Sequence, residues 1–441
     1  MSLLKNVSDQ KPREITMDIL GRRTGGEFIE TLLEQRLSQT RISAPDRRLC
    51  HELAYGIIRW QMTLDWLIAR KTGNRTQKPA LQNLLRLGLY QIFWLERIPN
   101  HAAVNETVEL AKTRGFGAQS GFVNAILRGY LREFDATKQA LLELKNNQPA
   151  LGYSHPEWLV QRWEPRWGRE QTKQLLEWNN IPPKTFARIN SLKADAGKLL
   201  TQWRNEDVEY DFVRRDWLEE NLIFELKSHP PLASLPSFAQ GLFYIQDPST
   251  LLAVSDLDPH PGEAVLDLCA APGGKLTYIA QLMQNQGRLV AHDTKPDRLR
   301  LVQQNCDRLG VTCAQTESAA EFRQFGSAKT SPGFDRILVD APCSNTGVMR
   351  RRVDLRWRIR PEEVQRLSAG QLSLLKAASA VLKPGGTLIY STCSLEPEEN
   401  AEVVGAFLKT SPQIQLQKER ELQPFKDGVD GAYVARLVRT S

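Results

Sequence analysis

The feature of the sequence that most constrains its fold is an alternation of short apolar runs with helical patterns from residue 264 onward. The apolar runs cover 264–268, 288–292, 311–315, 336–339 and 387–391. Between the second and third runs, residues 297–309 carry apolar side chains on one helical face and stop at Gly310, a residue type that commonly ends helices. Alternation of this kind is typical of a parallel sheet wound with helices. We therefore expect a Rossmann-like α/β domain over residues 236–441.

Two further regions precede this domain, as the length of 441 residues allows. Residues 1–145 show helical periodicity, and Asp46 is predicted to cap the first clear helix. Three more helices are predicted over 81–94, 104–111 and 122–131. Residues 146–235 are rich in tryptophan and proline and have weaker periodicity, so we predict a small α+β connecting domain there. The fold class is thus multidomain.

Composition bounds the kind of partner and the compartment. An excess of Lys and Arg (58) over Asp and Glu (51) gives a net charge of +7, which favours polyanionic partners such as nucleic acid or an anionic membrane. A mildly basic enzyme with a small-molecule substrate is the alternative. The first ten residues lack the apolar core of a signal peptide, and no window is suited to span a membrane, so a cytoplasmic location is expected.

The six cysteines are spread along the chain, and none forms a Cys-x-x-Cys pair. This spacing argues against a disulfide framework and against a structural zinc site, so no metal is expected. Four of them fit the ordinary role of a small buried side chain, namely Cys50, Cys269, Cys306 and Cys313. Cys343 and Cys393 fit it less well, because both follow predicted strands and lie in polar turns.

A turn of small residues follows the first strand of the α/β domain. It reads Cys-Ala-Ala-Pro-Gly-Gly-Lys at 269–275, and its glycines let a nucleoside-like ligand approach the backbone beyond the carboxyl end of the strand. Leu276 after the Gly-Lys pair excludes a P-loop, and the absence of Gly-x-Gly-x-x-Gly disfavours a nicotinamide site. Asp293 follows the next strand, about 20 residues past the turn, where a carboxylate can bind ribose hydroxyls. A plain helix N-cap is the alternative role for this residue.

Four motifs carry a resemblance to a known family. In order, they are Phe-Tyr-Ile-Gln-Asp-Pro-Ser at 243–249, Leu-Cys-Ala-Ala-Pro-Gly-Gly-Lys at 268–275, Asp-Ala-Pro-Cys-Ser-Asn-Thr-Gly at 340–347 and Tyr-Ser-Thr-Cys-Ser at 390–394. The set resembles the Sun-type RNA cytosine-carbon-5 methyltransferases, which implies a class I methyltransferase fold and S-adenosylmethionine as cofactor. The residues predicted at the cofactor are Cys269, Ala270, Ala271, Pro272, Gly273, Gly274, Lys275, Asp293, Glu317 and Asp340. Glu317 stands where family members often carry the acid that meets the adenine.

Methylation of carbon 5 of cytosine needs a cysteine, because that carbon is barely nucleophilic in an aromatic ring. A thiolate that adds to carbon 6 breaks the aromaticity and lets carbon 5 attack the methyl sulfonium. The residues alone leave Cys343 and Cys393 as two candidates. The resemblance implies that Cys393 is the nucleophile, that Cys343 assists product release and that Asp340 contacts the polar edge of the ring. DNA cytosine methyltransferases use the cysteine of their Pro-Cys motif, so the reverse assignment stays open, and a turn cap is the alternative for Asp340.

Two features point to RNA as the substrate. The basic run at 349–360 follows the Pro-Cys motif, and its Arg350, Arg351 and Arg352 are predicted to contact RNA phosphates, with a solvated charged loop as the alternative. The helical region resembles the NusB-type RNA-binding domain in Ser-Ala-Pro-Asp-Arg-Arg at 43–48 and Ile-Pro-Asn-His-Ala-Ala-Val-Asn-Glu-Thr at 98–107. Together the domains resemble bacterial members of the family that act on 16S ribosomal RNA, which implies a cytosine in that RNA as target. No obligate protein partner is indicated.

Three other functions compete with this hypothesis. One is a catalytically silent RNA-binding or ribosome assembly factor, against which the intact Cys343, Cys393 and Asp340 argue. Another is a methyltransferase acting on tRNA cytosine. The third is a small-molecule methyltransferase, which the helical domain and the basic run disfavour.

Overall fold

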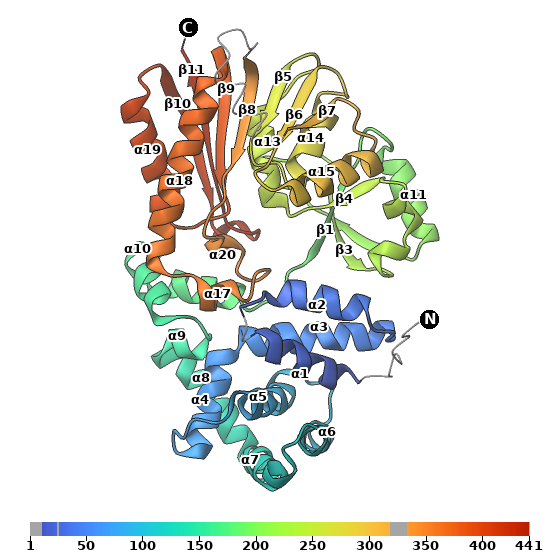
Figure 1. Cartoon of the computed structure of the whole chain (residues 1–441), viewed down its shortest axis with the longest axis vertical. Helices are drawn as coiled ribbons and strands as arrows, with labels where there is room; N and C mark the ends of the chain where they lie inside the picture. Colours follow the sequence, from blue (N-terminus) through green and yellow to red (C-terminus); the bar gives the residue numbers. More distant parts are fainter. Residues whose placement is uncertain (1–10, 24–25, 318–332, 441) are drawn as a thin grey trace, which may run out of the picture. The chain divides into compact units, whose positions relative to one another are not determined.

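The structure is a computed structural model that describes residues 11–23, 26–317 and 333–440 (Figure 1). The first ten residues, for which no signal peptide is expected, lie outside the described residues. The chain forms two compact units. The helical unit is Met1–Ile181 with Arg352–Arg358, and the catalytic unit is Pro182–Arg351 with Ile359–Ser441. The first unit therefore extends beyond the expected domain boundary at residue 145 and includes a piece of the C-terminal half.

The helical unit contains α-helices and one short 3-10 helix. They are α1 Pro12–Arg23, α2 Ile29–Ser38, α3 Ala44–Arg59, α4 Gln61–Thr72, α5 Pro79–Trp94, α6 Asn100–Thr113, η1 Gly117–Gln119, α7 Ser120–Arg132, α8 Phe134–Asn147, α9 Pro149–Gly152, α10 Glu157–Trp178 and α17 Leu355–Arg358. Helices α5, α6 and α7 extend the predicted segments by a few residues at their ends. No helix in the described ranges carries an apolar stretch suited to crossing a membrane.

Helix α3 shows how local sequence sets these elements. Its buried face is formed by Leu53, Ala54 and Ile57, as the periodicity predicts. The prediction that Asp46 caps the helix is wrong, because Ser43 is the N-cap and its side-chain oxygen accepts a hydrogen bond from the Asp46 amide at 3.2 Å. Asp46 lies in the first turn instead, where a carboxylate interacts favourably with the helix dipole.

A seven-residue piece of the C-terminal half, Arg352–Arg358, is part of the helical unit, and we call it the inserted segment. Its Asp354 accepts a hydrogen bond from the Ile29 amide at 2.6 Å, at the first turn of α2, and forms an ion pair with Arg23. The side chain of Phe28, the N-cap residue of α2, makes no capping hydrogen bond. Asp354 therefore satisfies an amide at the start of α2 that would otherwise lack a partner.

The inserted segment also contributes to the core of the helical unit. The Arg356 side chain is fully buried, and its guanidinium donates to four oxygens, those of the Arg59, Ser154 and Asn179 carbonyls and the Asn180 side-chain amide. The Trp357 indole donates to the Ile58 carbonyl at 2.8 Å, and Val353 is completely buried in the same core. Burying an arginine is costly unless its donors are satisfied, which explains the concentration of carbonyls around Arg356.

The catalytic unit begins with an antiparallel sheet of order β2-β3-β1-β4. Its elements are β1 Thr185–Ile189, α11 Ala196–Asn205, β2 Glu209–Phe212, β3 Ile223–Ser228, η2 Leu232–Ser234, α12 Pro236–Ala239 and β4 Phe243–Ile245. Trp203 of α11 is completely buried and packs edge-on against Phe224 and Phe243 of this sheet. The predicted α+β connecting domain is thus confirmed as a fold, and its core is continuous with that of the larger sheet.

The larger sheet has seven strands in the order β10-β11-β9-β8-β5-β6-β7. Its elements and their helices are η3 Pro248–Leu251, α13 Leu252–Leu257, β5 Ala264–Asp267, α14 Gly274–Leu282, β6 Arg288–His292, α15 Pro296–Leu309, β7 Ala314–Glu317, β8 Phe334–Asp340, η4 Thr346–Val348, α18 Pro361–Ala380, β9 Leu382–Thr392, η5 Pro397–Glu399, α19 Ala401–Thr410, β10 Ile414–Leu422, α20 Pro424–Asp427 and β11 Ala432–Arg439. Strands β5 to β9 pair in parallel, and β10 and β11 are antiparallel. The predicted Rossmann-like fold is confirmed.

Helices cover both faces of this sheet (Figure 1). Alternate residues of β5, β6, β8 and β9 pack into two different cores. In β5, Val265 packs into the core that includes α13, α14 and α15, whereas Leu266 packs into the core that includes α18 and α19. Strand β6 repeats this division with Leu289 and Val290. Burial on both faces explains why these strands have continuous apolar sequences rather than alternating ones.

One strand begins later than its sequence predicts. The apolar run starts at Val311, but β7 starts at Ala314. The reason is the end of α15, where Gly310 adopts a left-handed backbone with φ 74° and the Val311 amide donates to the Cys306 carbonyl at 2.9 Å. This is the hydrogen bonding of a Schellman motif, so the amide of Val311 is used by the helix end and not by the sheet.

Candidate active site

Polar side chains gather at the carboxyl edge of the parallel sheet. Asp267 is the last residue of β5, Asp293 follows β6, Glu317 ends β7, Asp340 ends β8 and Cys393 follows β9. Because parallel strands end at one edge of the sheet, five separate sequence positions converge there. This is where open α/β sheets bind their ligands.

The turn at 269–275 leaves the backbone accessible between β5 and α14. Gly273 has a left-handed backbone with φ 103°, which a residue with a side chain rarely adopts. A β-carbon at Gly274 would lie 3.0 Å from the Tyr244 ring, closer than packing normally allows. The backbone at Gly273 and the close Tyr244 ring at Gly274 both favour glycine in this turn.

Side chains from neighbouring elements fix the carbonyls of the turn. Arg298 donates to the Ala271 carbonyl at 2.7 Å, and Asn305 donates to the Pro272 carbonyl at 2.9 Å. From the smaller sheet, the fully buried Arg188 donates to the Gly274 carbonyl at 2.7 Å and to the Thr277 hydroxyl at 3.0 Å. Sequence reasoning missed Arg188, because nothing local marks an arginine in a strand as a support for a turn 86 positions away.

Asp267 is a buried carboxylate beside this turn, with 1% of its surface exposed. Among the described residues, no well-aligned hydrogen-bond donor reaches either of its oxygens. Burial and the neighbouring Asp340 raise the pKa of Asp267 to about 7, although Lys275 and the Cys269 amide act in the opposite direction. Buried oxygens of this kind favour a ligand that brings N–H or O–H groups. Asp267 was not among the predicted site residues, although its place at the end of a strand before a glycine turn was a usable signal.

Two of the predicted acids, Asp293 and Glu317, have partners. Asp293 is 4% exposed; it accepts a hydrogen bond from the Lys295 amide at 3.1 Å and lies 3.2 Å from the Arg298 guanidinium. Helix α15 starts at Pro296, and its N-cap is Lys295. Glu317 lies 3.7 Å from Arg288, in register with His292 of β6.

The two cysteines singled out by the sequence lie side by side. The Sγ atoms of Cys343 and Cys393 are 3.3 Å apart, close enough for one thiol to donate a hydrogen bond to the other. Cys393 also contacts the Asn345 side-chain oxygen at 3.2 Å. Cys343 is buried, whereas Cys393 is partly exposed. Among the described residues, no cluster of His, Cys, Asp and Glu is suited to hold a metal ion.

The charges around the two thiols differ. The Lys275 ammonium lies 2.5 Å from a carboxylate oxygen of Asp340, whose other oxygen accepts from the Ser391 hydroxyl at 2.8 Å. Burial alone would lower the pKa of Lys275. The opposite effect of Asp340 is larger and Cys393 adds to it, so the pKa of Lys275 is raised. Lys275 therefore stays charged close to Cys393. The hydrogen bond with Cys393, followed by burial and the charge of Glu399, raises the pKa of Cys343.

Glu399 joins the two turns that carry the cysteines. It is completely buried, and its carboxylate accepts from the Ser344 amide at 2.8 Å and from the hydroxyls of Ser344 and Ser394. Gln371 donates to it at 3.0 Å. Burial raises the pKa of Glu399, and these hydrogen bonds lower it. Ser344 and Ser394 each follow one cysteine in the chain, so one carboxylate holds both cysteine turns together, a role that no local pattern in the sequence indicates.

The three predicted RNA-contacting arginines have different surroundings. Arg350 is buried and its guanidinium lies 2.5 Å from a carboxylate oxygen of Asp430. Arg351 bonds to Asp247 at 2.7 Å and also pairs with Asp430. Burial and Asp247 raise the pKa of Asp430 to about 6, and the two arginines oppose this. Arg352 is exposed and belongs to the inserted segment.

Comparisons with known proteins agree with this architecture. A NusB family model matches residues 10–132, a ferredoxin-like domain model of RsmF/B-like methyltransferases matches 155–225, and a 16S rRNA methyltransferase RsmB/F model matches 254–438. A probable ribosomal RNA small subunit methyltransferase B of Bacillus subtilis is 38% identical, and the match covers 94% of both chains. A ribosomal RNA small subunit methyltransferase B of Klebsiella pneumoniae is 34% identical, with 95% of this chain and 98% of the relative covered.

Solved structures share the fold. PH0851 has a TM-score of 0.76 at 24% identity, and the match covers 98% of this chain and all of the other. A methyltransferase homolog protein from Pyrococcus horikoshii has a TM-score of 0.57 at 31% identity, over 66% of this chain and 97% of the other.

The doubly wound sheet and the turn at its carboxyl edge define a Rossmann-like methyltransferase. The chain belongs to the 16S rRNA methyltransferase RsmB/F family, because the model of that family matches residues 254–438 and relatives named ribosomal RNA small subunit methyltransferase B align with the chain over nearly its whole length. It is an enzyme that methylates ribosomal RNA. The family resemblance predicted from the four motifs and the NusB-like helices is confirmed.

Proposed function

We propose that the chain methylates carbon 5 of a cytosine in 16S ribosomal RNA, in the cytoplasm, with S-adenosylmethionine as methyl donor and Cys393 as transient nucleophile. The observation that carries the proposal is the contact between the Cys343 and Cys393 sulfurs, 3.3 Å apart at the ligand-binding edge of the sheet. A reaction in which a thiolate first adds and later leaves benefits from a second thiol at that distance. The names of the relatives support the small-subunit RNA as substrate.

The residues at the turn fit S-adenosylmethionine. This molecule carries ribose hydroxyls and an amino group, and Asp293 and the hydrogen-bond-deficient Asp267 offer buried carboxylate oxygens to such donors. Gly273 and Gly274 let the ligand approach the backbone. Glu317, at the end of β7, is the candidate contact for the adenine. When bound, S-adenosylmethionine supplies an electrophilic methyl group on a positively charged sulfur.

Cys393 is the better-placed nucleophile. The Lys275 ammonium attracts negative charge on its sulfur, whereas Cys343 is buried and its raised pKa keeps its proton in place. The Cys393 thiolate forms a bond to carbon 6 of the cytosine, and the electrons of the 5,6 double bond move to carbon 5. Asp340, held by Lys275 and Ser391, would contact the polar edge of the ring.

The product forms when the same bond breaks. After methyl transfer, a base removes the proton from carbon 5, the 5,6 double bond forms again and the electron pair of the sulfur–carbon bond returns to Cys393. Cys343 holds a thiol within hydrogen-bond distance of that sulfur, so it stabilises the charge that develops as Cys393 leaves. Glu399 positions both cysteines through Ser344 and Ser394.

The direct test is to map 5-methylcytosine at single-nucleotide resolution in total RNA from cells with and without the gene. We expect one cytosine of 16S ribosomal RNA to lose its methyl group in the deletion strain and regain it with the intact gene, but not with Cys393→Ala. If only tRNA lost a methyl group, the substrate would be a tRNA cytosine and not a cytosine of 16S ribosomal RNA. Unchanged methylation at every cytosine would reject the activity and favour an assembly factor.

A further inference from the structure

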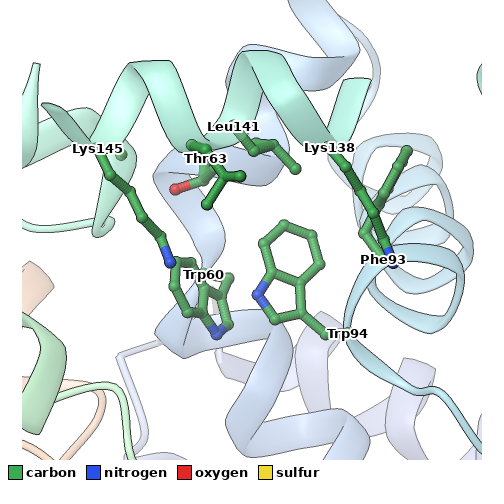
Figure 2. A pocket seen from close by; sticks show the side chains of 9 residues that line it. Trp60, Thr63, Phe93, Trp94, Lys138, Leu141 and Lys145 are labelled. Atoms are coloured by element: carbon green, nitrogen blue, oxygen red, sulfur yellow. The ribbon is translucent and has the colours of Figure 1, made fainter. Parts of the chain in front are cut away.

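The helical unit contains a pocket that no role in methyl transfer explains. Figure 2 shows the indole rings of Trp60 and Trp94 on one side of an open space, with the helix that carries Lys138, Leu141 and Lys145 above them. That helix is α8, Trp94 ends α5 and Trp60 lies between α3 and α4. The pocket has a volume of about 200 Å³.

Aromatic faces dominate the wall of this pocket. The ring centroids of Trp60 and Trp94 are 5.0 Å apart with the rings tilted by 39°, and Trp94 stacks on Tyr90 at 5.8 Å. Packing against these neighbours fixes the Trp94 ring, so little conformational entropy remains to be lost when a ligand stacks on it. An apolar cavity of roughly 150 Å³ is large enough to bind benzene. The space here is therefore large enough for one aromatic ring with substituents.

The charged part of the pocket comes from α8. Lys138, Leu141, Leu142 and Lys145 have the i, i+3, i+4, i+7 spacing that places side chains on one helical face. Lys138 is exposed, and the Lys145 ammonium lies 5.5 Å from the Trp60 ring and 5.1 Å from the Tyr153 ring. The Lys138 ammonium lies 4.6 Å from the Phe134 ring, so each of the two ammonium groups contacts an aromatic face. Burial lowers the pKa of Lys145 in spite of a distant opposing effect of Glu177, and a bound anion would offset that cost.

We propose that this pocket binds one unpaired nucleotide of the RNA substrate, with its base against Trp94 and Trp60 and its phosphate at Lys138 and Lys145. Aromatic rings combined with lysines are the means by which proteins hold single-stranded nucleic acid, since every base offers a face for stacking and every nucleotide a phosphate. An apolar side chain of a protein partner would fill the ring-sized space but bring no anion to the two ammonium groups. The nucleotide uses both.

The inference rests on the proposed function only in taking ribosomal RNA as the ligand. Its consequence is that the helical unit holds a base in its own right, apart from the cytosine that is methylated. The site would recognise a single-stranded region and require no particular sequence, because stacking and phosphate contacts are shared by all nucleotides.

The test uses the full-length chain and a single-stranded decamer of uridine with one 5-bromouridine. Irradiation should form a cross-link that mass spectrometry maps to the peptide containing Trp94 or Trp60.

Leu142→Trp, which fills the pocket from an exposed position, should weaken binding about tenfold and remove this cross-link, whereas Leu142→Ala should bind like the wild type. Lys138→Gln should weaken binding and lower the slope of log affinity against log salt by about 0.7, and the matched control Lys112→Gln, on α6, should change neither.

Each outcome separates this inference from the proposed function. If Leu142→Trp and Lys138→Gln bind the decamer like the wild type while the protein methylates 16S ribosomal RNA, the pocket has no nucleotide and the proposed function stands. If the cross-link forms at Trp94 but no ribosomal cytosine is methylated, the pocket stands and the proposed function fails. Cross-links only at other peptides would overturn the inference. Wild-type affinity of Leu142→Trp for the decamer would overturn it as well.

Discussion

The sulfur of Cys343 lies 3.3 Å from the sulfur of Cys393, although fifty residues separate them in the chain. The two residues follow neighbouring parallel strands, β8 and β9, so the sheet brings both turns to one edge. Glu399 then fixes the turns to each other. The arrangement makes the roles of the two thiols separable by experiment.

We predict opposite failures for the two cysteine variants. Cys393→Ala should abolish methylation and every covalent protein–RNA species, because no adduct can begin. Cys343→Ala should still form the adduct but release it slowly, so a complex that resists denaturation should accumulate with cofactor and RNA. Denaturing gel electrophoresis distinguishes them. An adduct trapped by Cys393→Ala and none with Cys343→Ala would mean that Cys343 is the nucleophile.

Glu399→Gln should lower kcat at least tenfold while RNA affinity stays unchanged, because the cysteine turns lose a shared acceptor that the RNA does not contact. Glu399→Ala should also lower the free energy of unfolding by about 3 kcal/mol, since buried donors of Ser344 and Ser394 would lose their partner. Single-turnover methylation and urea unfolding measure the two effects. Glu402→Gln, an exposed carboxylate on α19, is the control and should behave like the wild type. Unchanged kcat in Glu399→Gln would contradict the positioning role.

The stability of the catalytic unit should depend on pH through Asp267. Burial raises its pKa to about 7, whereas an aspartate in an unfolded chain has a pKa of about 3.9. Between these two pKa values the folded chain keeps a proton on Asp267 that the unfolded chain has released. The contribution of Asp267 to the free energy of unfolding is therefore full below about pH 4, and it is lost as the pH rises through about 7.

Asp267→Asn removes the titrating group, so the variant does not lose this contribution when the pH rises. The free energy of unfolding of the variant minus that of the wild type should therefore increase by about 2–3 kcal/mol from about pH 5 to pH 8. Urea unfolding at both pH values measures the difference. Asp297→Asn changes a surface carboxylate and should show no such trend. A difference between Asp267→Asn and the wild type that does not change with pH would refute the prediction.

Asp293→Ala should weaken the binding of S-adenosylmethionine about tenfold to a hundredfold, the range expected when a charged hydrogen-bond acceptor is removed. Calorimetry with the purified protein in the presence of a chelator measures it, and the chelator should not affect the wild type. Asp297→Ala, an exposed carboxylate in the first turn of α15, is the nearby control and should bind S-adenosylmethionine like the wild type. Unaltered affinity in Asp293→Ala would exclude the ribose contact.

Two neighbouring arginines should respond differently to the same change. Arg352→Gln should leave stability unchanged and lower the salt dependence of RNA binding, because Arg352 is exposed. Arg350→Gln should instead lower the free energy of unfolding by about 3 kcal/mol, because the buried Asp430 would lose a partner. Thermal unfolding and binding at several salt concentrations separate the two effects. A loss of RNA affinity in Arg350→Gln without loss of stability would reverse this division.

The sequence was informative wherever local rules decide structure. The run at 288–292 coincides with β6, and the helix at 297–309 differs from α15 by one residue, because both depend on apolar periodicity and a glycine stop. The glycines at 273 and 274 were recognisable because they form a turn of small residues between a strand and a helix. The convergence of Asp340 and Cys393 followed from parallel strands that share an edge.

Other features depend on tertiary partners that no window of sequence contains. Arg188 and Glu399 differ from surface residues only through what the fold places around them. The basic run at 349–360 predicts a charged surface, yet Arg350 pairs with Asp430 and Arg356 is surrounded by backbone carbonyls. A buried arginine and an exposed one have the same sequence signature.

The inserted segment has a consequence for how such chains can be cut and recombined. Because Asp354, Arg356 and Trp357 complete the helical unit, the N-terminal residues alone lack part of their own interior. Removing the N-terminal residues would in turn expose Arg356 and Trp357 to water on the remaining protein. A chimera that exchanges the first 181 residues between relatives must therefore exchange Arg352–Arg358 as well. The gene encodes two units in four pieces, so its halves are constrained to diverge together.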